Sequence, residues 1–282
     1  VPRFENDGGT LAERFLREAR AAAKFTHPNI CPIYDVGEQD GRPFIAMGYV
    51  EGRPLTDYIS SGKSQPEREA AKVIRKVALA LHEAHAHGIL HRDLKPANIM
   101  IDTRGEPIVM DFGLACQFDD ESQTRLTQEG TIIGTPAYMS PEQIEDGNVG
   151  PASDVFSLGV VTYEFLTGRC PVEGSVVSVS GQVLHKEPPP LTKLRSDVSP
   201  ALVEIVERAL KKDPSQRFDS MKDFAKAISA MLKGQPTVAT KPAPADAPLL
   251  LASPQQDSQR KKWILAGAGA VNPVSDHVEA GQ

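Results

Sequence analysis

The chain has 282 residues, a hydrophobic content of 40% and a charged content of 24%, all ordinary for a soluble globular protein with a substantial core. Its net charge of −6 argues against a nucleic-acid binder, which would usually carry a basic face. The 3 cysteines are widely spaced and form neither a disulfide framework nor a metal-binding pattern, so we expect a reducing, cytoplasmic compartment.

The first part of the chain predicts one helix followed by two strands. A capping box at residues 10–13 opens the helix, and apolar residues at four-residue spacing continue it as one face, with Glu18 beside that face. Strands are expected at residues 31–36 and 43–49, and residues 37–41 are expected to form the turn between them.

A longer helix follows and leads into a loop of unusual composition. A second capping box at residues 64–67 opens this helix, with proline in its first turn. The sequence His-Arg-Asp-Leu-Lys-Pro-Ala-Asn at residues 91–98 holds an acid, a base and an amide close together, and its proline stiffens the loop. Short buried strands are expected at residues 99–101 and 108–110.

The second half predicts a polar segment and then several helices. The polar segment lies between Gly113 and Gly134, and the motif Gly-Thr-Pro-Ala-Tyr-Met-Ser-Pro-Glu at residues 134–142 closes the stretch that begins at Asp111. An apolar helix at residues 153–168 ends on a glycine, which is a typical terminator. Amphipathic helices are expected at residues 202–210 and 220–234.

Residues 91–98, together with Asp-Phe-Gly at residues 111–113, resemble the catalytic loop and metal-binding turn of protein kinases. Lys95 resembles the serine/threonine branch of that family, in particular its bacterial, eukaryotic-like members. The likeness covers about residues 1–232. It implies an α+β, two-lobed protein-kinase-like fold with an incomplete small lobe (helix C plus two strands) and a mainly helical large lobe.

The resemblance also implies a division of the chain into domains. Residues 1–52 would be the remnant of the small lobe, and residues 53–232 the large lobe with its catalytic and activation segments. Residues 233–262 would be a disordered linker rich in proline and alanine with a basic end, and residues 263–282 a truncated apolar tail.

By resemblance, catalysis would fall to residues in and around the two motifs. Asp93 would orient the substrate hydroxyl and accept its proton, and Lys95 would neutralise the moving γ-phosphate. Asn98 and Asp111 would hold Mg²⁺, a hard ion that prefers oxygen ligands. Thr135 would hydrogen-bond towards the base and the lysine and help to position the acceptor.

The resemblance implies a second set of residues around the nucleotide. Glu18 would pair with the lysine that grips the α- and β-phosphates. Met47 falls at the gatekeeper position, Tyr49 and Val50 at the hinge that offers backbone groups to adenine, and Met100 under the nucleotide.

The sequence departs from the family in its small lobe. The Gly-rich loop and the phosphate-gripping lysine do not occur in the sequence, and Gly48 replaces a usual hinge glutamate. We expect the chain to begin just after that lysine, so that three strands are absent and this chain alone is poorly active, because a lone strand pair is marginal in water.

The polar segment indicates a phosphorylation switch. Arg92 is the kind of arginine that captures a phosphate on such a loop, so autophosphorylation is expected at Thr127, with Thr131 second. The alternative is a flexible polar loop whose threonines stay unmodified.

Other residues are assigned structural roles. Asp154 would cap backbone N–H groups of the catalytic loop, and Arg217 would form a buried ion pair with Glu142. His91 is interpreted as a packed core residue beneath Phe112.

The end of the chain resembles the approach to a membrane span. Basic residues 260–262 precede an aromatic and a short apolar run at residues 263–271, the layout of a cytoplasmic flank. Spanning needs about 20 apolar residues, and Asn272 and Pro273 break the run. We therefore expect a membrane anchor only in a longer parent protein.

The leading hypothesis is an ATP- and Mg²⁺-dependent kinase that transfers the γ-phosphoryl group to serine or threonine hydroxyls of proteins. Nucleic acid is not an expected partner, and a homodimer is an option. One alternative is a pseudokinase or protein-binding scaffold without turnover. Another is a metal-binding regulator that uses His82, His85 and His87, although their spacing favours surface or packing roles.

Overall fold

The structure is a computed structural model that describes residues 26–39, 42–60, 65–112, 136–145 and 147–234. The strands of these residues are β1 (Ile33–Gln39), β2 (Arg42–Met47), β3 (Gly52–Pro54), β4 (Ile99–Asp102) and β5 (Pro107–Val109). The helices are α2 (Leu55–Ser60), α3 (Glu67–Ala86), α4 (Pro141–Ile144), α5 (Pro151–Thr167), α6 (Val176–His185), α7 (Leu191–Leu194), α8 (Pro200–Ala209) and α9 (Met221–Gly234). Three 3₁₀ turns in the same residues are η1 (Pro96–Asn98), η2 (Pro136–Tyr138) and η3 (Pro214–Gln216).

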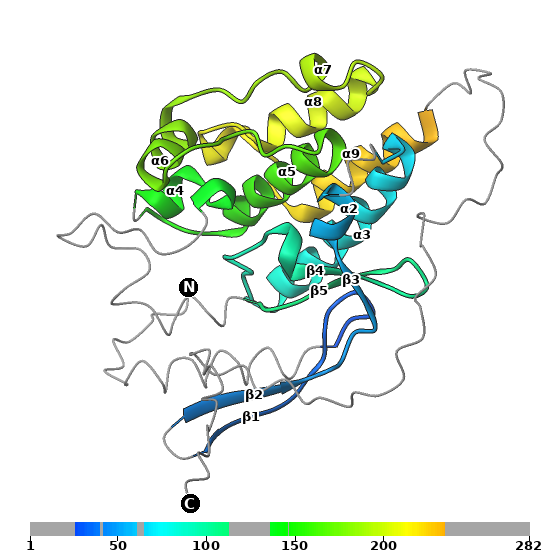
Figure 1. The fold of residues 1–282 in the computed structure, drawn as a ribbon, viewed down its shortest axis with the longest axis vertical. Coiled ribbons are helices and arrows are strands. Elements are labelled where there is room, and N and C mark those ends of the chain that lie inside the picture. The colour runs from blue at the N-terminus through cyan, green and yellow to red at the C-terminus, as the bar shows by residue number, and fades with distance from the viewer. Residues whose placement is uncertain (1–25, 40–41, 61–64, 113–135, 146, 235–282) are drawn as a thin grey trace, which may run out of the picture.

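Helix α5 is the centre of the helical body. Its residues from Ser153 to Val161 are all buried, polar side chains included, as expected for a helix surrounded by others. It packs against α3 on one side and α8 on another, while α9 covers α3 and α8 (Figure 1). Gly168 ends α5 in the left-handed conformation, with φ of 73°, which confirms the predicted terminator.

Helix α3 packs along one side of the helical body, and the catalytic loop at residues 91–98 follows it in the chain. Alanine, valine, isoleucine and leucine on one face of the helix are buried, and they pack against α9 and α5. The helix begins at Glu67, so Pro66 lies at the N-cap and not inside the first turn as predicted. Ser64 of the predicted capping box lies outside the described residues.

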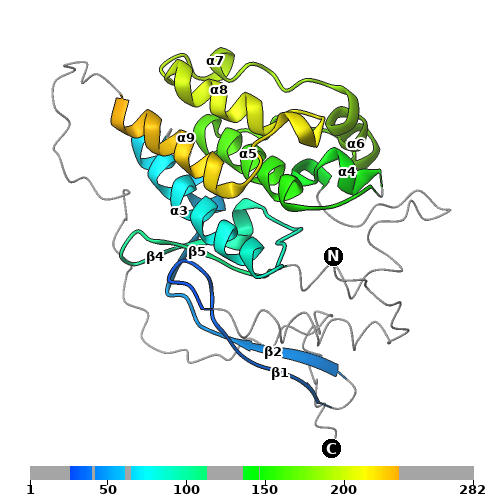
Figure 2. The ribbon, with the colours of Figure 1, turned by 180° about the vertical axis from the view of Figure 1, so that it is seen from behind.

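A three-stranded antiparallel sheet, in the order β3-β4-β5, lies along the underside of the helices (Figures 1 and 2). Strands β4 and β5 confirm the two short strands predicted on either side of residues 102–107. Ile99 and Ile101 are fully buried, whereas Met100 between them is partly exposed. Because side chains alternate along a strand, Met100 faces away from the helical core.

The β1–β2 hairpin lies beyond this sheet, on the side away from the helices (Figures 1 and 2). Both strands were predicted, but residues 37–39 continue β1 and do not belong to the turn. Gly37 pairs with Phe44, and a Cβ on residue 37 would come within 2.8 Å of the Phe44 ring. The glycine therefore marks a close approach inside the hairpin, which explains why it was mistaken for a turn signal.

These elements form a mixed, mainly helical fold with few strands, as the sequence predicted. The predicted helix C and its Glu18 lie outside the described residues, as do the polar segment at 113–135 and the tail after Gly234. None of the helices described is long and apolar enough to cross a membrane.

Candidate active site

Asp93, Lys95 and Asn98 form one hydrogen-bonded group in the loop that precedes β4. The ammonium Nζ of Lys95 lies 2.8 Å from Oδ2 of Asp93. The amide nitrogen of Asn98 donates to the backbone carbonyl of Asp93 at 2.8 Å and to Oδ2 at 3.1 Å. The tight turn η1 brings Asn98 back to Asp93, and its Pro96 supplies the fixed φ that such a turn needs.

Asp111 approaches this group from β5. The N–H of Met110 donates to the carbonyl oxygen of Asn98 at 2.8 Å, which ties the two motifs together immediately before Asp111. Asp111 has a φ of 49°, a left-handed conformation that is uncommon for a residue with a β-carbon. Partial loss of hydration, together with the like charge of Asp93, leaves the pKa of Asp111 above its usual value, although the positive charge of Lys95 opposes the shift.

The donor set at Asp111 and Asn98 fits a hard divalent cation. The Asp111 carboxylate accepts no hydrogen bond from the residues described, and its side chain is exposed. Because the Asn98 amide nitrogen is turned towards Asp93, its oxygen is directed elsewhere. Two oxygen donors beside excess negative charge are the arrangement that Mg²⁺ stabilises.

The backbone of the catalytic loop is anchored to α5 by Asp154, as predicted. Its Oδ2 accepts the N–H of His91 and its Oδ1 the N–H of Arg92, each at 2.9 Å. A third bond comes from Nε2 of His85 at 2.7 Å. Burial alone would raise the pKa of Asp154, but the hydrogen bonds from His85 and the backbone hold it below its usual value, so the carboxylate stays ionised.

His91 is a packed core residue, as interpreted from the sequence. Its side chain is fully buried, and its ring centroid lies 4.9 Å from that of Phe112. Its Nε2 donates to the carbonyl of Met110 at 2.9 Å, while Nδ1 has no partner among the residues described. Burial lowers the pKa of His91, so the ring is neutral and supports the Asp-Phe-Gly turn from below.

The hinge, residues 48–51, connects the β1–β2 hairpin to β3, and its first residue is Gly48 for a steric reason. A Cβ on residue 48 would come within 2.9 Å of Cγ of Pro32, so the glutamate usual in the family would not fit without a shift. The N–H of Gly48 donates to the Pro32 carbonyl at 2.8 Å, and its carbonyl accepts the Cys31 thiol at 3.2 Å. The N–H of Val50, in contrast, donates to no group within the described residues.

The residues predicted to contact the nucleotide do not all line the same hollow. Tyr49, which is 78% exposed, and Val50 line a hollow of about 560 Å³ together with Asp102 and Arg104. Met47 and Met100 do not line that hollow. Met47 ends β2, and Met100 lies on the sheet face opposite the helical core, next to Asn98.

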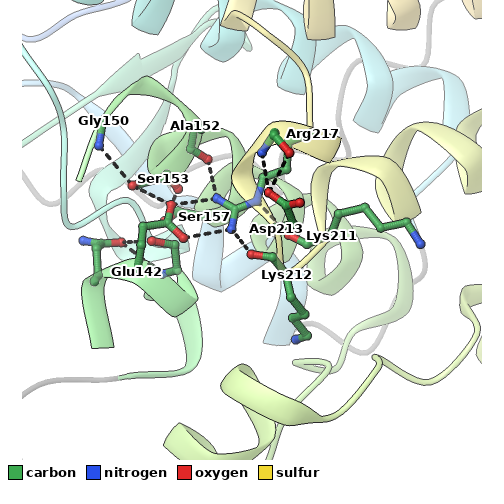
Figure 3. Close-up of polar contacts among 12 residues, drawn as sticks. Glu142, Gly150, Ala152, Ser153, Ser157, Lys211, Lys212, Asp213 and Arg217 are labelled. Atoms are coloured by element: carbon green, nitrogen blue, oxygen red, sulfur yellow. Dashed lines mark hydrogen bonds and ion pairs between the residues drawn. The ribbon is translucent and has the colours of Figure 1, made fainter. Parts of the chain in front are cut away.

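Arg217 and Glu142 form the predicted buried ion pair below the site, shown in Figure 3. The two pairs of atoms, Nη1 with Oε1 and Nη2 with Oε2, lie 2.7 and 2.8 Å apart, and the Arg217 side chain has no solvent exposure. Ser153 also donates to Glu142 at 2.7 Å. Burial would raise the pKa of Glu142, but the hydrogen bonds from Arg217 and Ser153 hold it below its usual value.

Sequence reasoning missed two residues that act on the catalytic loop. His85 was interpreted only as a surface or packing residue, yet it donates to Asp154. Gln143 was not singled out, yet its amide nitrogen donates to the carbonyl of Arg92 at 2.7 Å. Ser-x-x-Gln at residues 140–143 could have indicated a capping box, but no sequence signal indicated the contact with Arg92. Four further predicted residues, Glu18, Thr127, Thr131 and Thr135, lie outside the described residues.

The fold and the clustered motifs define the class of protein. A family model described as protein kinase domain matches residues 3–228. The chain therefore belongs to the protein kinase family.

Its relatives are bacterial serine/threonine-protein kinases. The chain is 39% identical over 261 residues to serine/threonine-protein kinase PknB of Mycobacterium leprae, covering 91% of this chain and 40% of that protein. It is 38% identical over 237 residues to probable serine/threonine-protein kinase PknB of Lactococcus lactis, covering 82% and 37%. Serine/threonine-protein kinase PrkC of Bacillus subtilis is 39% identical over 222 residues, covering 78% and 34%. The chain thus spans two fifths or less of the length of these three relatives.

Proposed function

We propose that this protein is an ATP-dependent protein serine/threonine kinase. The observation that supports this best is the hydrogen-bonded group of Asp93, Lys95 and Asn98, with Asp111 held beside it by the backbone. Phosphoryl transfer needs positioning and charge neutralisation more than covalent chemistry, and this group supplies both. The bacterial relatives carry the same activity in their names.

Each residue of the group has one task. Asp93 accepts the proton of the substrate serine or threonine hydroxyl, because its carboxylate is partly exposed to solvent and is held by Asn98. Lys95, which already contacts Asp93, lies where it can neutralise the phosphoryl group as it moves towards the hydroxyl. Thr135 is proposed to help position the acceptor.

Asn98 and Asp111 would hold Mg²⁺ through one amide oxygen and one carboxylate. When bound, the ion neutralises charge on the phosphates. The nucleotide itself is proposed to lie over Met100 with its adenine at the hinge, where the N–H of Val50, which has no acceptor among the residues that the structure describes, is available as a donor. Met47, Tyr49 and Glu18 complete the proposed set of nucleotide contacts.

The partners, the division into lobes and the cellular location are also proposals. ATP and protein substrates are the proposed partners, and a homodimer is a further option. Residues 1–52 and 53–232 are proposed as the small and large lobes. We also propose that the parent protein acts on the cytoplasmic side, anchored in the membrane by a segment after residue 262.

The decisive experiment compares Asp93→Asn with Asp57→Asn, a matched change on an exposed residue of α2. Transfer of phosphate from labelled ATP to a protein acceptor should fall about 10²-fold or more in Asp93→Asn, because general-base catalysis contributes that much. Asp57→Asn should leave the rate unchanged. Undiminished transfer by Asp93→Asn, with melting temperatures equal, would rule out the proposed base.

A further inference from the structure

Arg92 occupies a strained turn directly before the proposed base. Its φ of 63° lies in the left-handed region. The N–H of Asp93 donates to the carbonyl oxygen of His91 at 2.8 Å, which closes a three-residue γ-turn around Arg92. A γ-turn with positive φ is rare and strained, so surrounding contacts must keep it from relaxing. The orientation of Asp93 depends on those contacts.

The turn is held from two sides by different parts of the fold. Asp154 of α5 binds the N–H groups of His91 and Arg92, as described above. On the other side, the carbonyl oxygen of Arg92 accepts the amide nitrogen of Gln143 at 2.7 Å. That carbonyl belongs to the same planar peptide as the N–H of Asp93. Gln143 therefore fixes the peptide that leads directly into the proposed base.

Gln143 is itself held in one orientation by the start of α4. Its Oε1 accepts the backbone N–H of Ser140 at 3.0 Å and the Ser140 hydroxyl at 3.2 Å. If the amide were turned over, its NH₂ would face the Ser140 N–H and its oxygen would face the Arg92 carbonyl, which are both repulsive pairings. Ser140 is fully buried, so the link has a rigid base.

We propose that Gln143 is a positioning residue for phosphoryl transfer, which links the α4 region to the peptide that orients Asp93. It touches none of the reacting groups and acts through Arg92. This link keeps the strained turn in place and holds the Asp93 carboxylate beside Lys95 and Asn98. The inference rests on the proposed function only in naming Asp93 as the base.

The variant Gln143→Glu removes only the hydrogen-bond donor that reaches the Arg92 carbonyl. A glutamate has the same shape and can still accept both hydrogen bonds from Ser140, but it cannot donate to the Arg92 carbonyl. We expect kcat to fall about tenfold or more, because a small misplacement of a catalytic group has a large effect on rate. KM for ATP should change by less than about twofold, because the nucleotide contacts remain. Gln143→Leu, which removes the donor without adding charge, should show the same loss of kcat.

A matched control makes the same Gln-to-Glu substitution at another position. Gln182 of α6 also donates its amide nitrogen to a backbone carbonyl, that of Glu173, at 2.8 Å. Gln182→Glu should leave kcat within about twofold of the unsubstituted protein's value, because the contact lies away from the catalytic loop.

Amide hydrogen exchange gives a second readout that needs no activity. The Asp93 amide should exchange about tenfold faster in Gln143→Glu and unchanged in Gln182→Glu, since its protection reflects the stability of the turn.

The outcomes separate this inference from the proposed function. If the longer parent protein, without any substitution, transfers no phosphate, the proposed function fails, and exchange of the Asp93 amide still decides the role of Gln143. If Gln143→Glu retains both the kcat of the unsubstituted protein and its exchange rate at the Asp93 amide, the inference is wrong. It is also wrong if kcat falls only together with the melting temperature and with faster exchange throughout the chain, because the role would then be structural.

Discussion

Arg217 is the most completely satisfied side chain in the described residues. Its guanidinium makes five hydrogen bonds, two to Glu142 and the others to the backbone carbonyls of Lys211, Lys212 and Ala152. A guanidinium has five N–H donors, so none is left unpaired in the interior. The ion pair joins the loop before α9 to the start of α4, the same helix that carries Gln143.

Replacing Arg217 should therefore be strongly destabilising. We expect Arg217→Met to lower the free energy of unfolding by about 3–5 kcal/mol, because it leaves the Glu142 carboxylate buried without its partner. Urea denaturation measures the difference. The matched control is Arg104→Met, since the Arg104 side chain is 77% exposed in its ion pair with Asp102. Water screens this exposed guanidinium, and backbone N–H groups also bind the Asp102 carboxylate, so Arg104→Met should cost only about 0–1 kcal/mol. Equal losses in the two variants would contradict the prediction.

The contact between α5 and α8 shows how two elements depend on one small residue. Gly159 lies in the middle of α5, where a Cβ would come within 2.9 Å of Cβ of Ala209 and 3.2 Å of Cδ2 of Leu210. Glycine weakens a helix, so its presence here reflects the close approach of the two helices. Gly181, in the middle of α6, has no such neighbour within 4 Å.

The two glycines should consequently respond to alanine in opposite directions. Gly159→Ala should lower the free energy of unfolding by about 1–3 kcal/mol, because the methyl group forces α5 and α8 apart. Gly181→Ala should raise it by about 0.5–1 kcal/mol, because alanine favours the helix and meets nothing. Thermal unfolding of both variants gives the comparison. A gain in melting temperature for Gly159→Ala would show that the helices do not meet as described.

At the scale of the whole molecule, buried carboxylates tie distant segments together. Asp154 joins α5 to the end of α3 and to the catalytic loop, and Glu142 joins α4 to the loop before α9. In the folded protein the pKa of each is held below its usual value. Each group therefore contributes stability that is present above its unfolded pKa and is lost as the pH falls through its folded pKa.

The protein should accordingly become less stable in acid. Asp111 and Glu164 have raised pKa values and act in the opposite sense, and their contribution changes mainly above the pH at which unfolded carboxyl groups titrate, about 4. Below that pH, the free energy of unfolding should fall by up to roughly 1.4 kcal/mol per pH unit for each of Asp154 and Glu142. Urea midpoints measured between pH 5 and pH 2.5 test this slope.

The variant Glu142→Gln serves as the internal reference for that titration. It removes one ionisable group, so its stability should depend less steeply on pH below about 4 than that of the parent, although it starts from a lower value. The same slope in both proteins would exclude Glu142 as a source of the acid sensitivity.

Much of the fold could be predicted because its signals are local. The periodicity of α8 and α9 follows from which side chains must leave water, and Gly168 ends α5 for a reason that lies in its own backbone. The error at residues 37–39 came from treating Gly37 as a turn signal, when the ring of Phe44 on the paired strand was what required a glycine. Cross-strand contacts of this kind are invisible until the register is known.

The residues of the proposed catalytic group could be recognised from the amino-acid sequence alone. Asp93, Lys95 and Asn98 are close along the chain, so one short loop is enough to bring an acid, a cation and an amide together. Only the tertiary structure decided how that loop is held: the left-handed backbone of Arg92, its bond to Gln143 and the contact of His85 with Asp154. Hydrogen bonds between segments far apart in sequence arise only when packing of the helices brings their donors and acceptors within reach.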